Sequence, residues 1–324
     1  MKKLSILIAA YNVETFIEKC VLSCYDDSLS DLYEIIVVND GSTDSTANAL
    51  DKLKNSVKNL HVIYQENSGL GTARNTGIKN AKGEYLWMID GDDYASNNAV
   101  KIILDKISSK EDIYGFNFNI ITENNKVIKK YKSNFIKEKQ TASEYYLNHY
   151  EDSYTFQYIF KKNLFIDNDI FFQSRINMQD SEILPKLIYR ANNLIYTDEC
   201  IYNYVQHENS FTNTANTEKR LNYFRSIISV DNSLKEFGQQ IIEKDRVLYN
   251  GIQEKRKSLH RVVLHHLIFF SYSKAGLIKI INYLKENKFY PLKHNAKGKF
   301  LWIKYGLNNF PVFTKKVIDY YLKQ

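Results

Sequence analysis

The sequence predicts an α/β fold with a mostly parallel sheet over residues 1–215, followed by a helical region over residues 216–324. Three observations lead to this prediction. Apolar runs alternate with helical spacing in the first hundred residues, polar clusters follow four of these runs, and only helical periodicity remains beyond Asn213. With 44% hydrophobic and 14% aromatic residues but only 3 Pro and 12 Gly, the chain is expected to be folded throughout.

Strand and helix signals alternate strictly at the start of the chain. Apolar runs typical of doubly covered strands occupy residues 4–11, 33–40, 60–65 and 84–90, and helical spacing occupies residues 12–24, 42–55 and 71–83. Ser and Thr residues are expected to cap the second helix, and Gly83 to close the third. Ligands of such sheets bind beyond the carboxyl ends of the strands, so the polar clusters there are expected to line one crevice.

The pattern becomes mixed after residue 111. Strand-like segments at 112–121 and 193–206 and helix-like segments at 141–151 and 179–191 indicate an extension of the sheet that carries a second half of the site. Residues 217–237, 244–273 and 275–287 and a last segment ending at Gln324 then predict four helices.

The cysteine content and the hydropathy of the sequence indicate in which cellular compartment the protein is expected. Cys20, Cys24 and Cys200 form no C-x-x-C pair, which disfavours a disulfide framework or a zinc site. The basic, apolar N-terminus is interrupted by Tyr11 and Asn12, so we interpret it as a strand rather than a signal peptide. Because no window reaches the roughly 18 apolar residues of a membrane span, we expect a cytoplasmic protein that is soluble or peripheral at the inner face of the membrane.

The most informative stretch is "WMIDGDD", residues 87–93, in which Asp90, Asp92 and Asp93 follow a strand directly. Carboxylates this close repel one another unless a cation offsets their charge. Hard divalent ions prefer such oxygen ligands, and Gly91 lets the backbone approach a ligand. Mn²⁺ or Mg²⁺ is therefore the expected cofactor. The alternative to a metal site is a solvated acidic turn. For Asp93 two interpretations stay open, that it orients its neighbour or that it faces solvent.

Four motifs in series, "SILIAAYN", "EIIVVNDGSTDST", "ENSGLGTARNTG" and "WMIDGDD", resemble the family 2 glycosyltransferases over residues 1–215. A dinucleotide-binding dehydrogenase is disfavoured, since no G-x-G-x-x-G follows the first strand. The resemblance implies the GT-A fold and an inverting, metal-dependent hexosyl- or N-acetylhexosaminyltransferase. It would move a sugar from a UDP-sugar to a hydroxyl of a glycan or lipid-linked glycan in bacterial surface polysaccharide or capsule synthesis.

The resemblance also assigns site residues. Asp180 matches the catalytic base, although Gln179 stands before it where the family commonly has Glu. Asp92 matches the metal ligand, and His207 would complete the metal shell or contact the diphosphate; an imidazole favours Mn²⁺ over Mg²⁺. Arg74 has a second interpretation, as an ion pair on a helix surface. The positions implied to bind the nucleotide are Ala9, Tyr11, Asp40, Asn67, Arg74, Asp90 and Gly91.

Charge separates the two regions. Residues 216–324 hold 21 Lys and Arg against 8 Asp and Glu, a balance of +13, whereas residues 1–215 balance at −6. With aromatic residues among the lysines, this region would suit an anionic membrane surface; packing against the first domain or against another subunit of a homo-oligomer stays open. No nucleic-acid motif accompanies the charge. Two rival functions also remain, a glycan-binding or scaffolding module without turnover and a nucleotidyltransferase.

Overall fold

The computed structural model describes residues 2–132, 141–207, 217–293 and 299–321. The chain divides into two compact units, one of Met1–Arg175 and Gln179–His207, the other of Ile176–Met178 and Glu208–Gln324. The boundary predicted at residues 215/216 lies outside the described residues. Among the described helices, none has the length and apolar character needed to cross a membrane.

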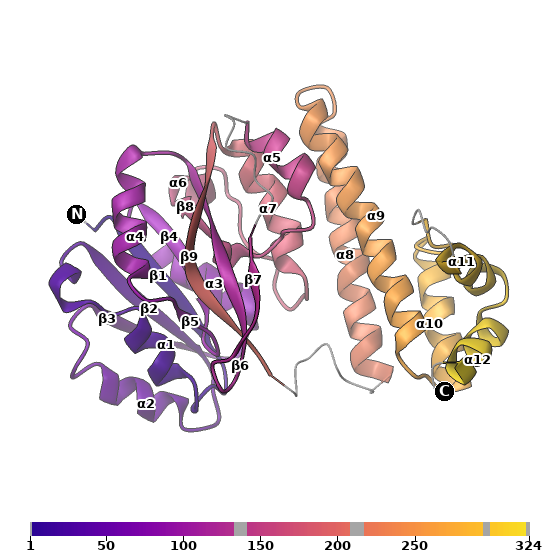
Figure 1. Ribbon diagram of the computed structural model, residues 1–324, viewed down its shortest axis with the longest axis horizontal. Helices are drawn as coiled ribbons and strands as arrows, with labels where there is room; N and C mark the ends of the chain where they lie inside the picture. Colours follow the sequence, from indigo (N-terminus) through magenta and orange to yellow (C-terminus); the bar gives the residue numbers. More distant parts are fainter. Residues whose placement is uncertain (1, 133–140, 208–216, 294–298, 322–324) are drawn as a thin grey trace. The chain divides into compact units, whose positions relative to one another are not determined.

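A nine-stranded sheet forms the centre of the first unit (Figure 1). Its first four strands pair in parallel in the order β3-β2-β1-β4, which confirms the parallel sheet predicted for this segment. Beyond β4 the sheet is mixed, because β8 is antiparallel to both neighbours while β6 and β9 run parallel. The strands are β1 (Leu4–Ala10), β2 (Tyr33–Asp40), β3 (Leu60–Gln65), β4 (Tyr85–Asp90), β5 (Tyr94–Ala95), β6 (Ile113–Thr122), β7 (Val127–Tyr131), β8 (Tyr158–Lys161) and β9 (Leu194–Gln206).

Along the chain, the helices of the first unit alternate with these strands. Every residue of β2 is buried, as expected for a parallel strand covered on both faces. The helices are α1 (Ile17–Ser23), α2 (Thr46–Leu53), α3 (Leu70–Asn80), α4 (Ala99–Lys106), α5 (Ala142–His149), α6 (Asn163–Ile166) and α7 (Gln179–Arg190), with 3₁₀ turns η1 (Asp27–Leu29), η2 (Ile107–Ser109) and η3 (Thr155–Gln157).

Two predicted helix ends were wrong. The Ser45 side chain makes no cap bond; instead Asp44 Oδ1 accepts a hydrogen bond from the Thr46 amide, 3.0 Å away, at the start of α2. Helix α3 ends at Asn80, and Gly83 lies beyond its cap. A Cβ on Gly83 would come within 2.5 Å of the β1 backbone, so the glycine serves close packing on the sheet.

The second unit is helical, as predicted, but it contains five described helices rather than four. Helices α8 (Thr217–Ile241) and α9 (Arg246–Phe269) pack together along their lengths (Figure 1). Arg256 of α9 pairs with Asp231 of α8 at 2.8 Å. Helices α10 (Lys274–Glu286), α11 (Lys299–Asn309) and α12 (Pro311–Tyr321) follow, and α11 is the helix that the sequence pattern did not indicate.

Candidate active site

The sheet register brings three strand ends to one edge. Ala9 near the end of β1 is opposite Val38 of β2 on one side and opposite Asp90 of β4 on the other. A Cβ on Gly91 would lie 2.9 Å from the Ala9 carbonyl oxygen, so this turn requires glycine to stay close to β1. Tyr11, directly after β1, has a half-exposed ring that is available for stacking.

A buried arginine joins two of the predicted site carboxylates. Arg74 of α3 is 4% exposed; its Nη2 donates to Asp90 Oδ1 at 2.8 Å and its Nη1 donates to Asp180 Oδ1 at 2.7 Å. Burial opposes the charge on Arg74, but Asp90 and Asp180 outweigh it and hold the pKa of the guanidinium above its usual value. Arg74 thus forms ion pairs, but these are buried among the predicted site residues and do not lie on a helix surface.

Asp180 lies in the first turn of α7, where the helix dipole favours a carboxylate. Besides the bond from Arg74, it accepts a hydrogen bond at Oδ2 from the Thr155 amide, 3.2 Å away. A carboxylate offers about four acceptor positions, so these bonds fix its orientation and leave positions for a proton. This arrangement can perform general-base chemistry.

Asp92 and His207 form the part of the site that fits a metal ion. His207 Nδ1 lies 2.8 Å from Glu123 Oε1, whereas its buried Nε2 has no hydrogen-bond partner and lies 3.6 Å from Asp92 Oδ2. A carboxylate behind one imidazole nitrogen with the other nitrogen open is typical of metal-binding histidines. Limited hydration, followed by repulsion from Asp90, raises the pKa of Asp92, a cost that a cation would relieve. Across the described segments no cluster of three or more His, Cys, Asp or Glu side chains is placed for a metal.

Asp93 does not face solvent. It is 2% exposed, and it accepts hydrogen bonds from the Tyr202 hydroxyl at 2.5 Å and the Val205 amide at 2.7 Å. Burial, with repulsion from Asp92 and Asp90, raises its pKa well above the usual range. The alternative that Asp93 faces solvent is therefore wrong, and these bonds fasten the acidic turn to β9.

Asp40 is buried, and its carboxylate already accepts three hydrogen bonds. Its oxygens accept bonds from Gln65 Nε2 at 2.7 Å and from the Ser68 and Gly69 amides at 2.9 and 2.8 Å. Asn67 Nδ2 donates to the Asp40 carbonyl at 3.0 Å. Asp40 and Asn67 therefore hold the loop before α3, and about one acceptor position of the carboxylate remains for a ligand.

The sequence alone did not indicate the aromatic side of the site. Tyr154, at the start of η3, and Tyr202 and Tyr204 of β9 lie beside the predicted carboxylates. Burial raises the pKa of Tyr204 to about 12, and the charges of Asp93, Asp92 and Asp90 add to this shift. The alternation "YNY" at 202–204 was the available signal, since period 2 puts both rings on one face of a strand.

These features define a nucleotide-sugar-binding α/β fold of the GT-A class, with acidic residues at the strand ends and a further carboxylate, Asp180, joined to one of them through Arg74. Residues 5–167 match the model for "Glycosyl transferase family 2". The chain belongs to this family, whose enzymes commonly use divalent metals.

Two relatives and one solved structure show the extent of the likeness. Glycosyltransferase EpsJ of Bacillus subtilis is 32% identical over 64% of this chain and 62% of its own length. Chondroitin synthase of Pasteurella multocida is 32% identical over 43% of this chain, but the match spans only 15% of that enzyme. TarS 1-349 of S. aureus, in complex with UDP-GlcNAc, superposes with a TM-score of 0.70 at 20% identity, covering 99% of this chain and 92% of that chain, which shows the shared fold.

Replacing Arg74 tests the central ion pairs. Arg74→Ala leaves Asp90 and Asp180 crowded without their buried cation, and we expect the free energy of unfolding to fall by about 3 kcal/mol in urea denaturation. The matched control is Lys54→Ala, which breaks the exposed pair of Lys54 with Asp51 and should cause no measurable change. Equal stability of the two variants would contradict the role given to Arg74.

Proposed function

We propose that the protein is a metal-dependent, inverting glycosyltransferase that moves a sugar from a UDP-sugar to a hydroxyl of a glycan or lipid-linked glycan acceptor. The observation that carries the proposal is the shared contact of Arg74 with Asp90 and Asp180. This contact holds Asp90, a carboxylate suited to a nucleotide ribose, and Asp180, a carboxylate suited to proton transfer, beside the same guanidinium.

In the proposed reaction, the acceptor hydroxyl oxygen forms a bond to the anomeric carbon of the donor sugar. The bond from that carbon to the diphosphate oxygen breaks on the opposite face, UDP leaves with the bonding electrons, and Asp180 takes the hydroxyl proton. The Thr155 amide and Arg74 orient Asp180 toward the acceptor. Asp92 and His207 would hold Mn²⁺ or Mg²⁺, which neutralises charge on the diphosphate when bound.

The choice of donor and acceptor rests on the site and on the relatives. Tyr11 is free to stack on a nucleobase, and Asp40 keeps about one position for an imide proton such as that of uracil. The structural neighbour TarS was solved in complex with UDP-GlcNAc, and one sequence relative is a chondroitin synthase. Both support a UDP-hexose or UDP-N-acetylhexosamine donor and an acceptor in bacterial surface polysaccharide or capsule synthesis.

Asp180→Asn tests the base. The variant should reduce transfer at least about 100-fold, because the amide cannot take the hydroxyl proton. UDP affinity measured by calorimetry should stay within about twofold, since the substitution leaves Asp92 and His207 intact. Asp167→Asn, an exposed carboxylate after α6, serves as the matched control and should transfer normally. Normal turnover by Asp180→Asn would refute the assignment.

Asp92→Ala tests the metal ligand. UDP binding by the unaltered protein should strengthen when Mn²⁺ is added, and the variant should lose most of that gain while its metal-free affinity remains. His207→Ala should lose a smaller part. If Mn²⁺ strengthened UDP binding equally in all three proteins, the ion would bind elsewhere.

The reaction products separate the rival functions. A glycosyltransferase should release UDP slowly from a UDP-sugar even without acceptor, whereas a nucleotidyltransferase would form or consume pyrophosphate. A binding module would release neither. Screening nucleotide sugars with Mn²⁺, with and without added pyrophosphate, distinguishes all three outcomes and also identifies the donor.

We further propose that α11 and α12 attach the protein to an anionic membrane surface. Trp302, Tyr305, Phe310 and Phe313 are each at least 60% exposed, and residues 274–324 carry 11 Lys against 2 acidic residues. Exposed aromatic rings among lysines suit the headgroup region of anionic lipids. Phe270, by contrast, packs under Arg220 within the helical unit, 3.6 Å from the guanidinium carbon to the ring centre.

Fluorescence can test this attachment directly. The chain has 2 Trp, of which Trp87 is buried in β4 and Trp302 is exposed. Vesicles containing phosphatidylglycerol should shift the emission to shorter wavelength, and Trp302→Phe should abolish the shift. An identical shift with purely phosphatidylcholine vesicles would remove the electrostatic argument, and no shift with either would refute the attachment.

A further inference from the structure

Two tyrosine rings lie partly exposed beside the proposed catalytic carboxylates. Tyr154 is 43% exposed and Tyr204 is 36% exposed, although both pack on the buried ring of Phe156. The ring centres of Tyr154 and Phe156 are 5.3 Å apart at 23°, and those of Phe156 and Tyr204 are 6.0 Å apart at 13°. The two exposed rings are therefore nearly parallel to one shared, buried neighbour.

Buried contacts hold this aromatic group in place. Phe156 stacks on the fully buried Tyr202, with ring centres 4.2 Å apart at 4°, and the Tyr202 hydroxyl donates to Asp93. Tyr204 adjoins Val205, whose amide donates to the same carboxylate. The rings are consequently fixed in position relative to the acidic turn, so a ligand on them would meet a preorganised surface.

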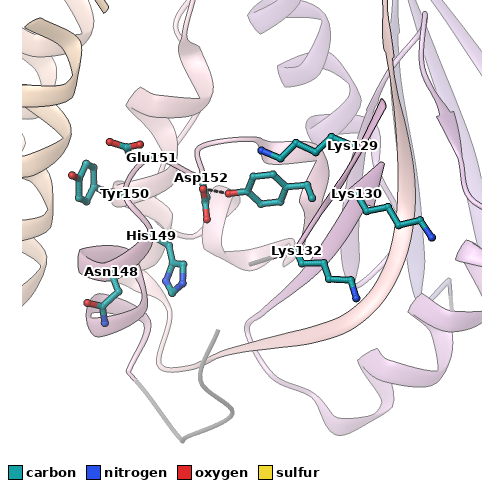
Figure 2. Close-up of a pocket in the computed structure, with 9 residues that line it drawn as sticks. Lys129, Lys130, Lys132, Asn148, His149, Tyr150, Glu151 and Asp152 are labelled. Carbon is teal, nitrogen blue, oxygen red and sulfur yellow. Dashed lines mark hydrogen bonds between the residues drawn. The ribbon is translucent and has the colours of Figure 1, made fainter. Parts of the chain in front are cut away.

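Tyr154 also precedes a residue that contacts the proposed base. The amide of the next residue, Thr155, donates to Asp180 Oδ2 at 3.2 Å. On its other side Tyr154 meets the edge of Tyr131, with ring centres 6.4 Å apart at 77°. Tyr131 in turn donates a hydrogen bond to Asp152 at the wall of an open cavity of about 570 Å³, which Lys129 and His149 also line (Figure 2).

We propose that Tyr154 and Tyr204 form a stacking platform for a pyranose ring of the acceptor, with the cavity beyond Tyr131 giving room to the sugar units attached to it. This inference rests on the proposed function. A pyranose has an apolar face of C–H groups that packs on aromatic rings, and its hydroxyl groups remain free at the rim. A ring on this platform presents a hydroxyl to Asp180, which the acceptor must do.

Saturation-transfer-difference NMR with methyl β-D-glucopyranoside and methyl N-acetyl-β-D-glucosaminide tests the platform in the unaltered chain of 324 residues. With saturating UDP and Mn²⁺ present, the C–H protons of at least one glycoside should receive saturation. Replacing both rings (Tyr154→Leu with Tyr204→Leu) should weaken this binding about tenfold, the expected value of two aromatic contacts. The matched control, Tyr154→Phe with Tyr204→Phe, keeps the rings and should bind within about twofold of the unaltered protein.

Two results would overturn the platform directly: no signal from the unaltered protein, or equal binding of the glycoside by the leucine variant. A third is displacement of the glycoside by UDP-GlcNAc but not by UDP, which would show that the rings bind the donor sugar instead. Each single leucine variant is measured as well, so the conclusion does not depend on the double variant folding. UDP-sugar hydrolysis is followed in the same preparations. Its absence from the unaltered protein would count against the proposed function, whereas loss of glycoside binding alone counts against the platform.

Discussion

The site depends on one buried guanidinium. Arg74 is held in the interior by α3 and neutralises one carboxylate at the end of β4 and one at the start of α7. Removing two such carboxylates from water is costly without a positive partner, and a planar guanidinium can donate to both at once. A lysine would place its charge at one point. Arg74 thus links the positions of Asp90 and Asp180 directly.

The three neighbouring carboxylates of the acidic turn have different partners. Asp90 pairs with Arg74, and Asp93 is buried against the Tyr202 hydroxyl and a β9 amide. Only Asp92 meets an imidazole with an unpartnered nitrogen, which is why it is the carboxylate that fits an added cation. Equal residue types in adjacent positions therefore take different roles, and the environment of each, rather than its identity, decides which.

Sequence patterns predicted the parallel strands well because doubly covered strands are continuous apolar runs, and polar residues must follow them at the ligand edge. They did not predict that Arg74 joins Asp90 and Asp180, since those contacts span 16 and 106 residues. Gly83 was misread for a similar reason: its constraint is a distant backbone, not its own helix. Helix α11 was not predicted because packing within the helical unit, rather than a clear hydrophobic period in its sequence, determines it.

Aromatic packing connects the acidic turn to residues 154–156. The hydrogen bond from Tyr202 to Asp93 connects the strand-end carboxylates to Phe156, and the Thr155 amide connects the same short segment to Asp180. Tyr154, Thr155 and Phe156 are consecutive, so one short segment carries the contact to the base and one of the two rings proposed to bind the acceptor.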